Sequence, residues 1–394
     1  MRRHSLLAAV GVSAVAIATA ALSTVAPATA APSPTALSNR AAHTCAQAAP
    51  GFAACTALVR LNNAGKPAAT AGPSGFGPTD IQSAYKLSTS AGAGKTVAIV
   101  DAYNDPTAEA DLGVYRSQFG LTACTTANGC FRKVSQTGST TALPATDAGW
   151  ATEISLDLDM VSAACPACKI LLVEANSASF ANLAAAVNYA ASQPGVVAIS
   201  NSYGGGDQAE LSAYNHPGIA ITASTGDGGY GVESPASFPH VVAVGGTSLK
   251  KSATTRGWTE TAWSGAGSGC SSRNARPSWQ TSATKCSGKA NADVSAVADP
   301  YTGVAVYDST PYQNASGWQV YGGTSASSPI VASVYAMSGN TAGYPASYTW
   351  AHASGLFDVT SGTNGHCRTK VWCTAGTGWD GPTGLGTPNG TSAF

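Results

Sequence analysis

The chain has 394 residues, of which only 10% are charged, and its 20 basic and 20 acidic side chains leave it with a net charge of zero. A chain without an excess of either sign has no field that would attract nucleic acid or an anionic membrane surface, so neither is expected as a partner. Its length allows one large core or two smaller ones.

Residues 1–30 are typical of an export signal. Two arginines follow the first methionine, a nearly unbroken run of small apolar residues covers 6–25, and Ala28-Thr29-Ala30 fits a cleavage site. A membrane anchor is the alternative, but the run ends at Pro27, and no later stretch is long and apolar enough to cross a bilayer. We therefore expect a secreted, extracellular, monomeric protein that is free of the membrane once the signal is removed.

Residues 31–75 are rich in Ala, Pro, Ser and Gly and have no firm periodicity. They are expected to form a linker or a short pro-segment in front of one folded domain at 76–394. Within this stretch, the loop between Cys45 and Cys55 is expected to form a small ordered piece.

From residue 76 onward, buried strands and helices alternate in the pattern. Strands are predicted at 96–100, 169–173, 196–200, 219–223 and 240–244, and helices at 109–119, 147–164 and 180–193. The helix at 147–164 carries its apolar residues in one stripe, which predicts an amphipathic helix. The alternation predicts an α/β fold with a mostly parallel central sheet flanked by helices on both faces.

Ten cysteines occur as close neighbours along the chain, and an even number in an exported protein indicates disulfides. The sequence does not determine their connectivity, but pairing of nearest neighbours is the simplest arrangement. The Cys165-Pro-Ala-Cys168 pair also fits a redox motif, yet it follows a helix, where the dipole does not stabilise a thiolate. The expected disulfides are Cys45–Cys55, Cys124–Cys130, Cys165–Cys168, Cys270–Cys286 and Cys367–Cys373.

The run Gly323-Thr-Ser325-Ala-Ser-Ser-Pro329 is typical of the nucleophile turn of subtilisin-like hydrolases. Ser325 is expected to open a helix, with Pro329 in its first turn, so that free N–H groups and positive potential lie beside the hydroxyl. A serine needs a base to become a nucleophile. None of the six histidines lies in the H-G-T context that supplies this base in subtilisins, so a carboxylate is the expected proton acceptor.

Glu153 and Asp157 are four residues apart in the helix predicted at 147–164, so their side chains share one face. On an arbitrary helix such a pair is a solvated acidic face. In this charge-poor chain, however, the pair flanks the apolar stripe. Two close carboxylates share a proton and one of them acquires a raised pKa. Glu153 is therefore the candidate general base for Ser325, with Asp157 holding and polarising it.

Two further aspartates follow predicted strands. Asp227 lies in a glycine-rich turn, where a protonated carboxyl group would donate a hydrogen bond to an oxyanion; an ordinary turn aspartate is the alternative. Asp101 ends the first strand and, with no histidine to orient, is assigned a supporting role through a hydrogen bond to Glu153. A structural aspartate at the strand end is the alternative there.

The carboxyl-terminal region contains an all-oxygen ligand set. Two carboxylates, from Asp358 and Asp380, combine with backbone carbonyl groups of a glycine loop, which suits a hard cation such as calcium. Taken alone, a G-x-G-x-D sequence is usually a plain loop. The expected ligands of one structural calcium ion are Asp358, Val359, Gly376, Gly378 and Asp380.

Together these residues resemble the sedolisin family, the serine-carboxyl peptidases. The E-x-x-x-D helix motif of that family matches Glu153 to Asp157, and its S-G-T-S-A-x-x-P motif matches 322–329, with Gly322 in the place of serine. Its G-D-S-G turn matches 226–229, with Gly228 in the place of serine, and its calcium loop matches the ligand set described above. The resemblance covers roughly residue 76 to the end of the chain.

The resemblance implies a subtilisin-like fold, a Ser-Glu-Asp triad with an aspartate in the oxyanion hole, one calcium ion and an acidic working range. It also implies that Ser200-Asn-Ser202-Tyr-Gly204 lies beside the substrate cleft. We therefore expect a secreted serine-type endopeptidase that acts on polypeptides in acid. A catalytically weak or silent binding protein on a peptidase fold is the alternative, because 31–75 is shorter than the folded pro-domain of the family. A histidine-dependent subtilisin using Asp101 ranks last.

Overall fold

The computed structural model describes residues 37–394 together with Met1, and an eight-stranded sheet organises this part of the chain. The predicted export signal lies outside the described residues. The strands follow the order β12-β11-β9-β7-β4-β6-β5, and β15 also pairs with β11. The strands are β4 (Thr96–Ala102), β5 (Phe131–Ser135), β6 (Lys169–Ala175), β7 (Val196–Asn201), β9 (Ala220–Ser224), β11 (Val242–Lys251), β12 (Trp258–Ala262) and β15 (Val294–Val297).

All neighbouring strands of this sheet are parallel except β11 and β12, which are antiparallel. Their sequences are near-continuous runs of Val, Ile, Leu and Ala, as expected of strands that are covered on both faces. The predicted α/β class with a mostly parallel sheet is confirmed. Each predicted strand is present, and the largest boundary difference is at β11, which extends to Lys251 because it pairs with β12.

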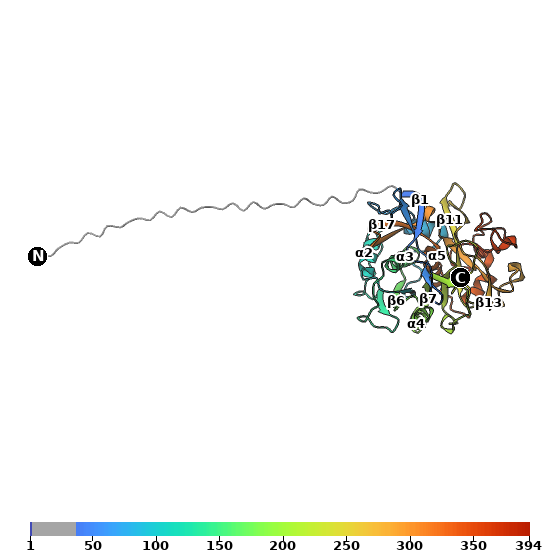
Figure 1. Cartoon of the computed structure of the whole chain (residues 1–394), viewed down its shortest axis with the longest axis horizontal. Coiled ribbons are helices and arrows are strands. Elements are labelled where there is room, and N and C mark those ends of the chain that lie inside the picture. The colour runs from blue at the N-terminus through green and yellow to red at the C-terminus, as the bar shows by residue number, and fades with distance from the viewer. Residues whose placement is uncertain (2–36) are drawn as a thin grey trace. The chain divides into compact units, whose positions relative to one another are not determined.

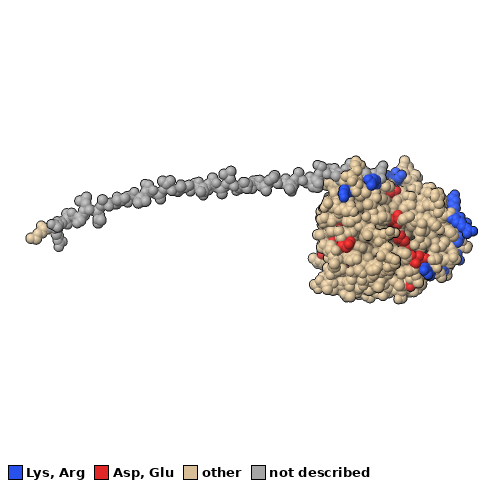
Figure 2. Space-filling model, in the orientation of Figure 1, with Lys and Arg blue, Asp and Glu red and all other residues tan. Residues whose placement is uncertain are grey.

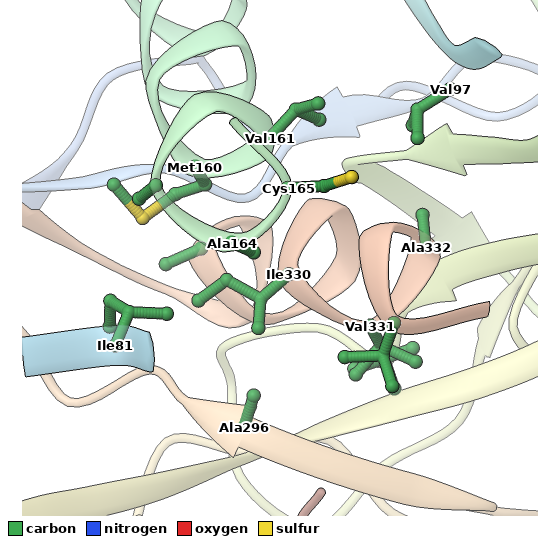
Figure 3. Packing of buried hydrophobic residues seen from close by; sticks show 14 of the residues in the cluster. Ile81, Val97, Met160, Val161, Ala164, Cys165, Ala296, Ile330, Val331 and Ala332 are labelled. Atoms are coloured by element: carbon green, nitrogen blue, oxygen red, sulfur yellow. The ribbon is translucent and has the colours of Figure 1, made fainter. Parts of the chain in front are cut away.

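Helices cover both faces of the sheet. In Figure 1, β6 and β7 lie between α3 and α5 on one side and α4 on the other. Figure 3 shows Ala164 of α3 beside Ile330 of α5, with Ile81 of α1 in the same core. The helices are α1 (Pro78–Tyr85), α2 (Ala108–Gln118), α3 (Ala148–Ala164), α4 (Phe180–Ala191), α5 (Thr324–Ser338) and α6 (Pro345–Ala351).

Helix α3 differs from its prediction, because it is buried on all sides and not along one stripe. Asp147 caps its first turn by accepting hydrogen bonds from the N–H groups of Gly149 and Trp150, both at 3.0 Å. Every residue from Gly149 to Ala164 is buried. The helix packs against α5, α1, α2, β4 and β16, so even its acidic face has no access to bulk water.

Residues 37–62 form three strands that belong to the same compact unit as the rest of the described chain. They join two smaller sheets, of order β1-β3-β17-β16 and β10-β8-β2, while a third small sheet contains β13 and β14. The strands are β1 (Leu37–His43), β2 (Ala54–Cys55), β3 (Leu58–Asn62), β8 (Tyr203–Gly206), β10 (Glu233–Ser234), β13 (Gly269–Ala275), β14 (Gly288–Asn291), β16 (Val304–Tyr312) and β17 (Ala315–Gly322).

The ten cysteines form five disulfides, each between the nearest neighbours that the spacing predicted. The Cys165–Cys168 disulfide follows the last residue of α3, at the carboxyl end of the helix. No helix of residues 37–394 has both the length and the apolar character of a membrane span.

Candidate active site

Ser325 lies in the first turn of α5, directly after β17. The turn between them passes through Gly323, whose φ of +94° is in the region that glycine adopts most readily. A Cβ atom at this position would come within 1.9 Å of the Thr56 carbonyl oxygen and 2.6 Å of Asp227 Oδ2. A side chain here is therefore excluded on two grounds, and the glycine lets three segments of the chain meet at the nucleophile.

Glu153 and Asp157 of α3 face this same turn, and neither has any exposed surface. Glu153 Oε2 accepts a hydrogen bond from the Ala57 N–H at 2.8 Å, while Oε1 has no partner among the described residues. Asp157 accepts the Ser202 hydroxyl at 2.7 and 2.8 Å with its two oxygens. The α3–α5 packing thus places both predicted acids next to the predicted serine.

Burial raises the pKa of Glu153 well above its usual range, and the charges of Asp101 and Asp227 add to this rise. The adjacent Ser325 hydroxyl offsets part of it. The pKa of Asp157 is also raised well above its usual range, first by burial and then by Asp101 and Glu153. Since every ionised carboxylate opposes the ionisation of the next, the cluster retains protons that exposed acids would lose.

Asp101 is the penultimate residue of β4 and is fully buried, but both of its carboxyl oxygens lack a hydrogen-bond partner within residues 37–394. The expected hydrogen bond to Glu153 is therefore not formed. Burial and the charge of Glu174 raise the pKa of Asp101 well above its usual range. The charge of Asp101 is one of the causes that raise the pKa values of Glu153 and Asp157.

Asp227 follows β9 and is only partly exposed. Its Oδ1 accepts hydrogen bonds from the Thr324 N–H and from Thr324 Oγ1, both at 2.8 Å, and the buried Oδ2 has no partner in the described part of the chain. Burial raises the pKa of Asp227 to about 8, with a further contribution from Glu233. At acidic pH the group is neutral, and Oδ2 is the oxygen free to carry a proton beside Gly323.

The Ser325 hydroxyl lies 2.8 Å from Thr56 Oγ1 and 3.4 Å from the Ser202 carbonyl oxygen. Thr56 Oγ1 in turn donates to Ser224 Oγ at 2.9 Å. Thr56 and Ala57 are therefore part of the site, although the sequence analysis placed them in a linker or a short pro-segment. No motif in 54–57 predicts a catalytic role. The expected Cys45–Cys55 disulfide was the single sequence feature that predicted an ordered structure here.

The cleft beside the nucleophile has a volume of about 770 Å³ and is lined by Gly204, Asp227, Glu233 and residues of the amino-terminal strands. Of the three predicted cleft residues, Gly204 lines it directly. Ser202 is buried between Asp157 and Thr56, and its carbonyl oxygen accepts a hydrogen bond from the Thr56 N–H at 3.2 Å. Ser200 lies away from the cleft, fully buried, with its hydroxyl 2.9 Å from Ser328 Oγ. Glu233 was not predicted.

No histidine of residues 37–394 is hydrogen-bonded to Ser325, Glu153, Asp157 or Asp227. His240 pairs with Glu210, His216 with Asn188 and His352 with the Tyr348 carbonyl. His43 lies at the outer wall of the cleft, where burial alone lowers its pKa. Within residues 37–394, no hydrogen bond joins a histidine to Ser325 or Asp101, which disfavours the histidine-dependent mechanism.

The predicted calcium loop brings its two aspartates together. Asp358 Oδ2 accepts the Gly378 N–H at 2.8 Å, and Asp380 Oδ2 accepts the Gly376 N–H at 3.1 Å. Burial raises the pKa of Asp380 to about 7, and Asp358 adds to the rise. Among the described residues, no group of three or more His, Cys, Asp or Glu side chains could hold a metal ion. The acidic groups of the predicted loop are thus the two carboxylates of Asp358 and Asp380, each of which accepts a glycine N–H.

Three comparisons with known proteins all find similarity to subtilases or sedolisins. The subtilase family model matches residues 135–380, more than half of the chain. Kumamolisin of Bacillus sp. (strain MN-32) is 30% identical over 367 residues, which is 82% of this chain and 63% of kumamolisin. Sedolisin of Pseudomonas sp. (strain 101) is 35% identical over 176 residues, which is 40% of this chain and 29% of sedolisin.

A solved structure of Pseudomonas sedolisin, a serine-carboxyl proteinase complexed with two molecules of pseudo-iodotyrostatin, has a TM-score of 0.67 at 27% identity. The match covers 80% of this chain and 96% of that chain, and it confirms the predicted subtilisin-like fold. This chain spans less than two thirds of the length of kumamolisin and of full-length sedolisin.

Proposed function

Because the chain belongs to the subtilase family, and within it to the sedolisins, we propose that it is a serine-carboxyl peptidase that hydrolyses peptide bonds of proteins in acid. The observation that carries the proposal is the meeting of Ser325 with the buried Glu153 and Asp157 and the partly exposed Asp227, where no histidine of residues 37–394 is hydrogen-bonded to Ser325. A serine beside a water-excluded carboxylate has the base that a nucleophile requires.

In this mechanism Ser325 Oγ attacks the carbonyl carbon of the substrate while Glu153 takes its proton. Glu153 Oε1 is the atom available for this, because Oε2 is already engaged by an N–H group. Asp157, held through both oxygens by Ser202, supports Glu153 from the same helix face. Glu153 then returns the proton to the leaving amine, and water hydrolyses the acyl-enzyme.

The oxyanion is bound by protonated Asp227 and by the backbone N–H of Ser325 at the start of α5. Asp227 is suited to this role because Thr324 holds Oδ1 and leaves Oδ2 free. A carboxyl group donates a hydrogen bond only when protonated. The requirement that Asp227 carries a proton while a carboxylate of the cluster accepts one supports activity on the acidic side of neutrality.

We further propose that one structural calcium ion is held by Asp358, Asp380 and backbone carbonyl groups of Val359, Gly376 and Gly378. The ion would neutralise two neighbouring carboxylates, of which Asp358 adds to the raised pKa of Asp380. Its contribution is to stabilise the carboxyl-terminal loop, and no chemical step passes through it.

The partners proposed are polypeptide substrates, and the proposed location is outside the cell, in keeping with five disulfides. In Figure 2, acidic side chains form a band across the middle of the face in view, while Lys and Arg lie mostly around its margin. This face therefore offers no basic field for nucleic acid. We propose that the protein acts as a monomer.

The test is incubation of the purified chain with a denatured protein at about pH 4 and about pH 7, in the range where clustered carboxyl groups titrate. Fragments at about pH 4 that are absent with Ser325→Ala support the proposal. Absence of fragments from the parent chain at both pH values would leave the silent binding protein as the better account. Maximal cleavage at neutral pH would contradict the carboxylate mechanism.

A further inference from the structure

The net charge of zero conceals an uneven distribution of charge along the chain. No aspartate or glutamate occurs between Glu260 and Asp293, and none occurs between Asp358 and Asp380. Both of these acid-free stretches contain exposed cations. These cations are Arg273, Arg276, Lys285, Arg368 and Lys370. Where cations are concentrated without acids, the surface has a local field that the total charge does not reveal.

Two disulfide-closed loops carry these five cations. The Cys270–Cys286 disulfide closes the first loop, and the Cys367–Cys373 disulfide closes the second. The indole N–H of Trp372, in the second loop, donates to the Thr284 carbonyl oxygen of the first loop at 2.8 Å. The two loops therefore lie side by side, and residues 270–286 and 367–373 together are called the basic lobe below.

The cations of the basic lobe face solvent and are not neutralised by acids. In Figure 2, Lys and Arg gather at the right margin of the face in view, in the part of the molecule where Figure 1 places β13. Within residues 37–394, none of the five forms an ion pair with a carboxylate. Asp207 contacts the lobe but accepts hydrogen bonds from Ser271 and Ser272, and Glu210 pairs with His240. The positive charge of the lobe is therefore available to a partner.

The composition of the basic lobe fits a partner that carries strong-acid groups. Arginine binds sulfate and phosphate groups through paired N–H donors, and lysine binds them as a point charge. Carboxylates of a partner lose much of their charge at about pH 4, whereas sulfate and phosphodiester groups stay ionised there. The preference for strong-acid groups rests on the acidic working range of the proposed function.

The aromatic side chains of the lobe favour a sugar polymer over single-stranded nucleic acid, which is bound by stacking its bases on exposed rings. These side chains are Trp279 and Trp372, and both are half-buried. Trp279 packs beside Tyr344 and His240, and the N–H group of Trp372 is engaged by the Thr284 carbonyl. The lobe thus offers charge without a platform for bases.

We propose that the basic lobe binds an anionic polysaccharide that carries sulfate or phosphodiester groups, and that this binding retains the exported protein at a surface or matrix. None of the residues that line the cleft beside Ser325 belongs to the lobe. A polymer held on the lobe therefore leaves the nucleophile and the proposed base accessible to polypeptide substrates.

The experiment measures the binding of labelled dextran sulfate and of poly(glycerol phosphate) to the parent chain at about pH 4, with uncharged dextran as the control polymer. For the five cations of the lobe, the affinity for an anionic polymer should fall about 10²-fold between about 50 mM and about 200 mM salt. Binding of one of the two anionic polymers alone supports the proposal and identifies the recognised group. Binding of neither, or equal binding of uncharged dextran, overturns it.

A matched pair of variants separates the lobe from the total charge of the chain. Arg276 is kept in both variants because it donates to the Thr281 carbonyl oxygen at 3.1 Å. The lobe variant carries Arg273→Gln, Lys285→Gln, Arg368→Gln and Lys370→Gln. The control variant removes the same number of exposed cations outside the lobe and carries Arg40→Gln, Lys66→Gln, Lys169→Gln and Lys250→Gln.

The lobe variant is expected to bind dextran sulfate or poly(glycerol phosphate) at least about 10-fold more weakly than the parent at about 50 mM salt, while the control variant stays near the parent. Melting curves establish that both variants are folded. Equal weakening in the two variants would show that the total charge controls binding, and it would overturn the basic lobe as the site.

Two further measurements test the class of partner and the place of binding. A single-stranded DNA with the same number of charges that binds more tightly than dextran sulfate would show contacts with bases and would overturn the choice of a polysaccharide. Cleavage of a short peptide that is unchanged in saturating dextran sulfate supports a surface apart from the cleft, and competitive inhibition overturns it. Binding is also measured with Ser325→Ala, so a parent chain without peptidase activity overturns the proposed function and leaves the binding result standing.

Discussion

Asp227 offers the sharpest test of the mechanism, because one side chain has two separable tasks. Oδ1 holds the start of α5 through Thr324, and Oδ2, which has no partner among the described residues, carries the proton proposed for the oxyanion. Asp227→Ala removes both. Asp227→Asn keeps an oxygen for Thr324 and places an N–H₂ group, which donates at every pH, where Oδ2 stood.

The expected magnitudes differ accordingly. Loss of one oxyanion donor costs about 10²- to 10³-fold in kcat, so Asp227→Ala should fall by that amount. With a pKa of about 8, Asp227 in the resting chain keeps its proton throughout the acid range and loses it above that value. Asp227→Asn should therefore stay within about 10-fold of the parent in acid and lose the part of the alkaline decline that Asp227 causes.

The assay is kcat and KM for a quenched-fluorescence peptide from about pH 3 to about pH 9, with melting curves for each variant. A kcat for Asp227→Ala within about threefold of the parent would refute the oxyanion role, since a missing donor costs far more. An alkaline decline in Asp227→Asn identical to that of the parent would show that another group controls it.

Three further outcomes are expected. Ser325→Ala and Glu153→Gln should each lower kcat at least about 10⁴-fold, with melting temperatures close to that of the parent; residual activity of a few per cent in either would exclude it as nucleophile or base. Burial raises the pKa of Asp308 and Glu233 to about 7. The folded chain therefore favours their protonated forms. This contribution to stability is fully present below their unfolded pKa values and is lost as pH rises through about 7. Ser325→Ala should therefore melt at a higher temperature at about pH 5 than at about pH 8.5, and the reverse order would contradict this. A calcium chelator should lower the melting temperature of the parent but not of Asp380→Ala, and equal curves with and without chelator would remove the calcium site.

Much of the fold was predictable because its signals are local. The buried strands are continuous apolar runs that end at glycine or polar residues, and Ser179 caps α4 through its hydroxyl. The spacing from Glu153 to Asp157 places two carboxylates on one helix face in any environment. The requirement for glycine before Thr324 is also a local signal, because Gly323 has a positive φ.

The surroundings of these residues were less predictable. An apolar stripe indicates that one side of a helix is buried, but it does not reveal that a second sheet covers the other side of α3. For the same reason the direction of Ser200 was missed: the residue alternates away from the cleft and meets Ser328 of α5. Burial by distant segments is a property of the tertiary structure and has no period in the sequence.

The amino-terminal strands were the least predictable part. Strand β2 has two residues, too few for any periodicity, and its partner β8 lies about 150 residues further along the chain. Such pairing depends on backbone groups, which every residue except proline offers alike. An alanine-rich composition therefore reads as a linker until the strand edge that it covers is known.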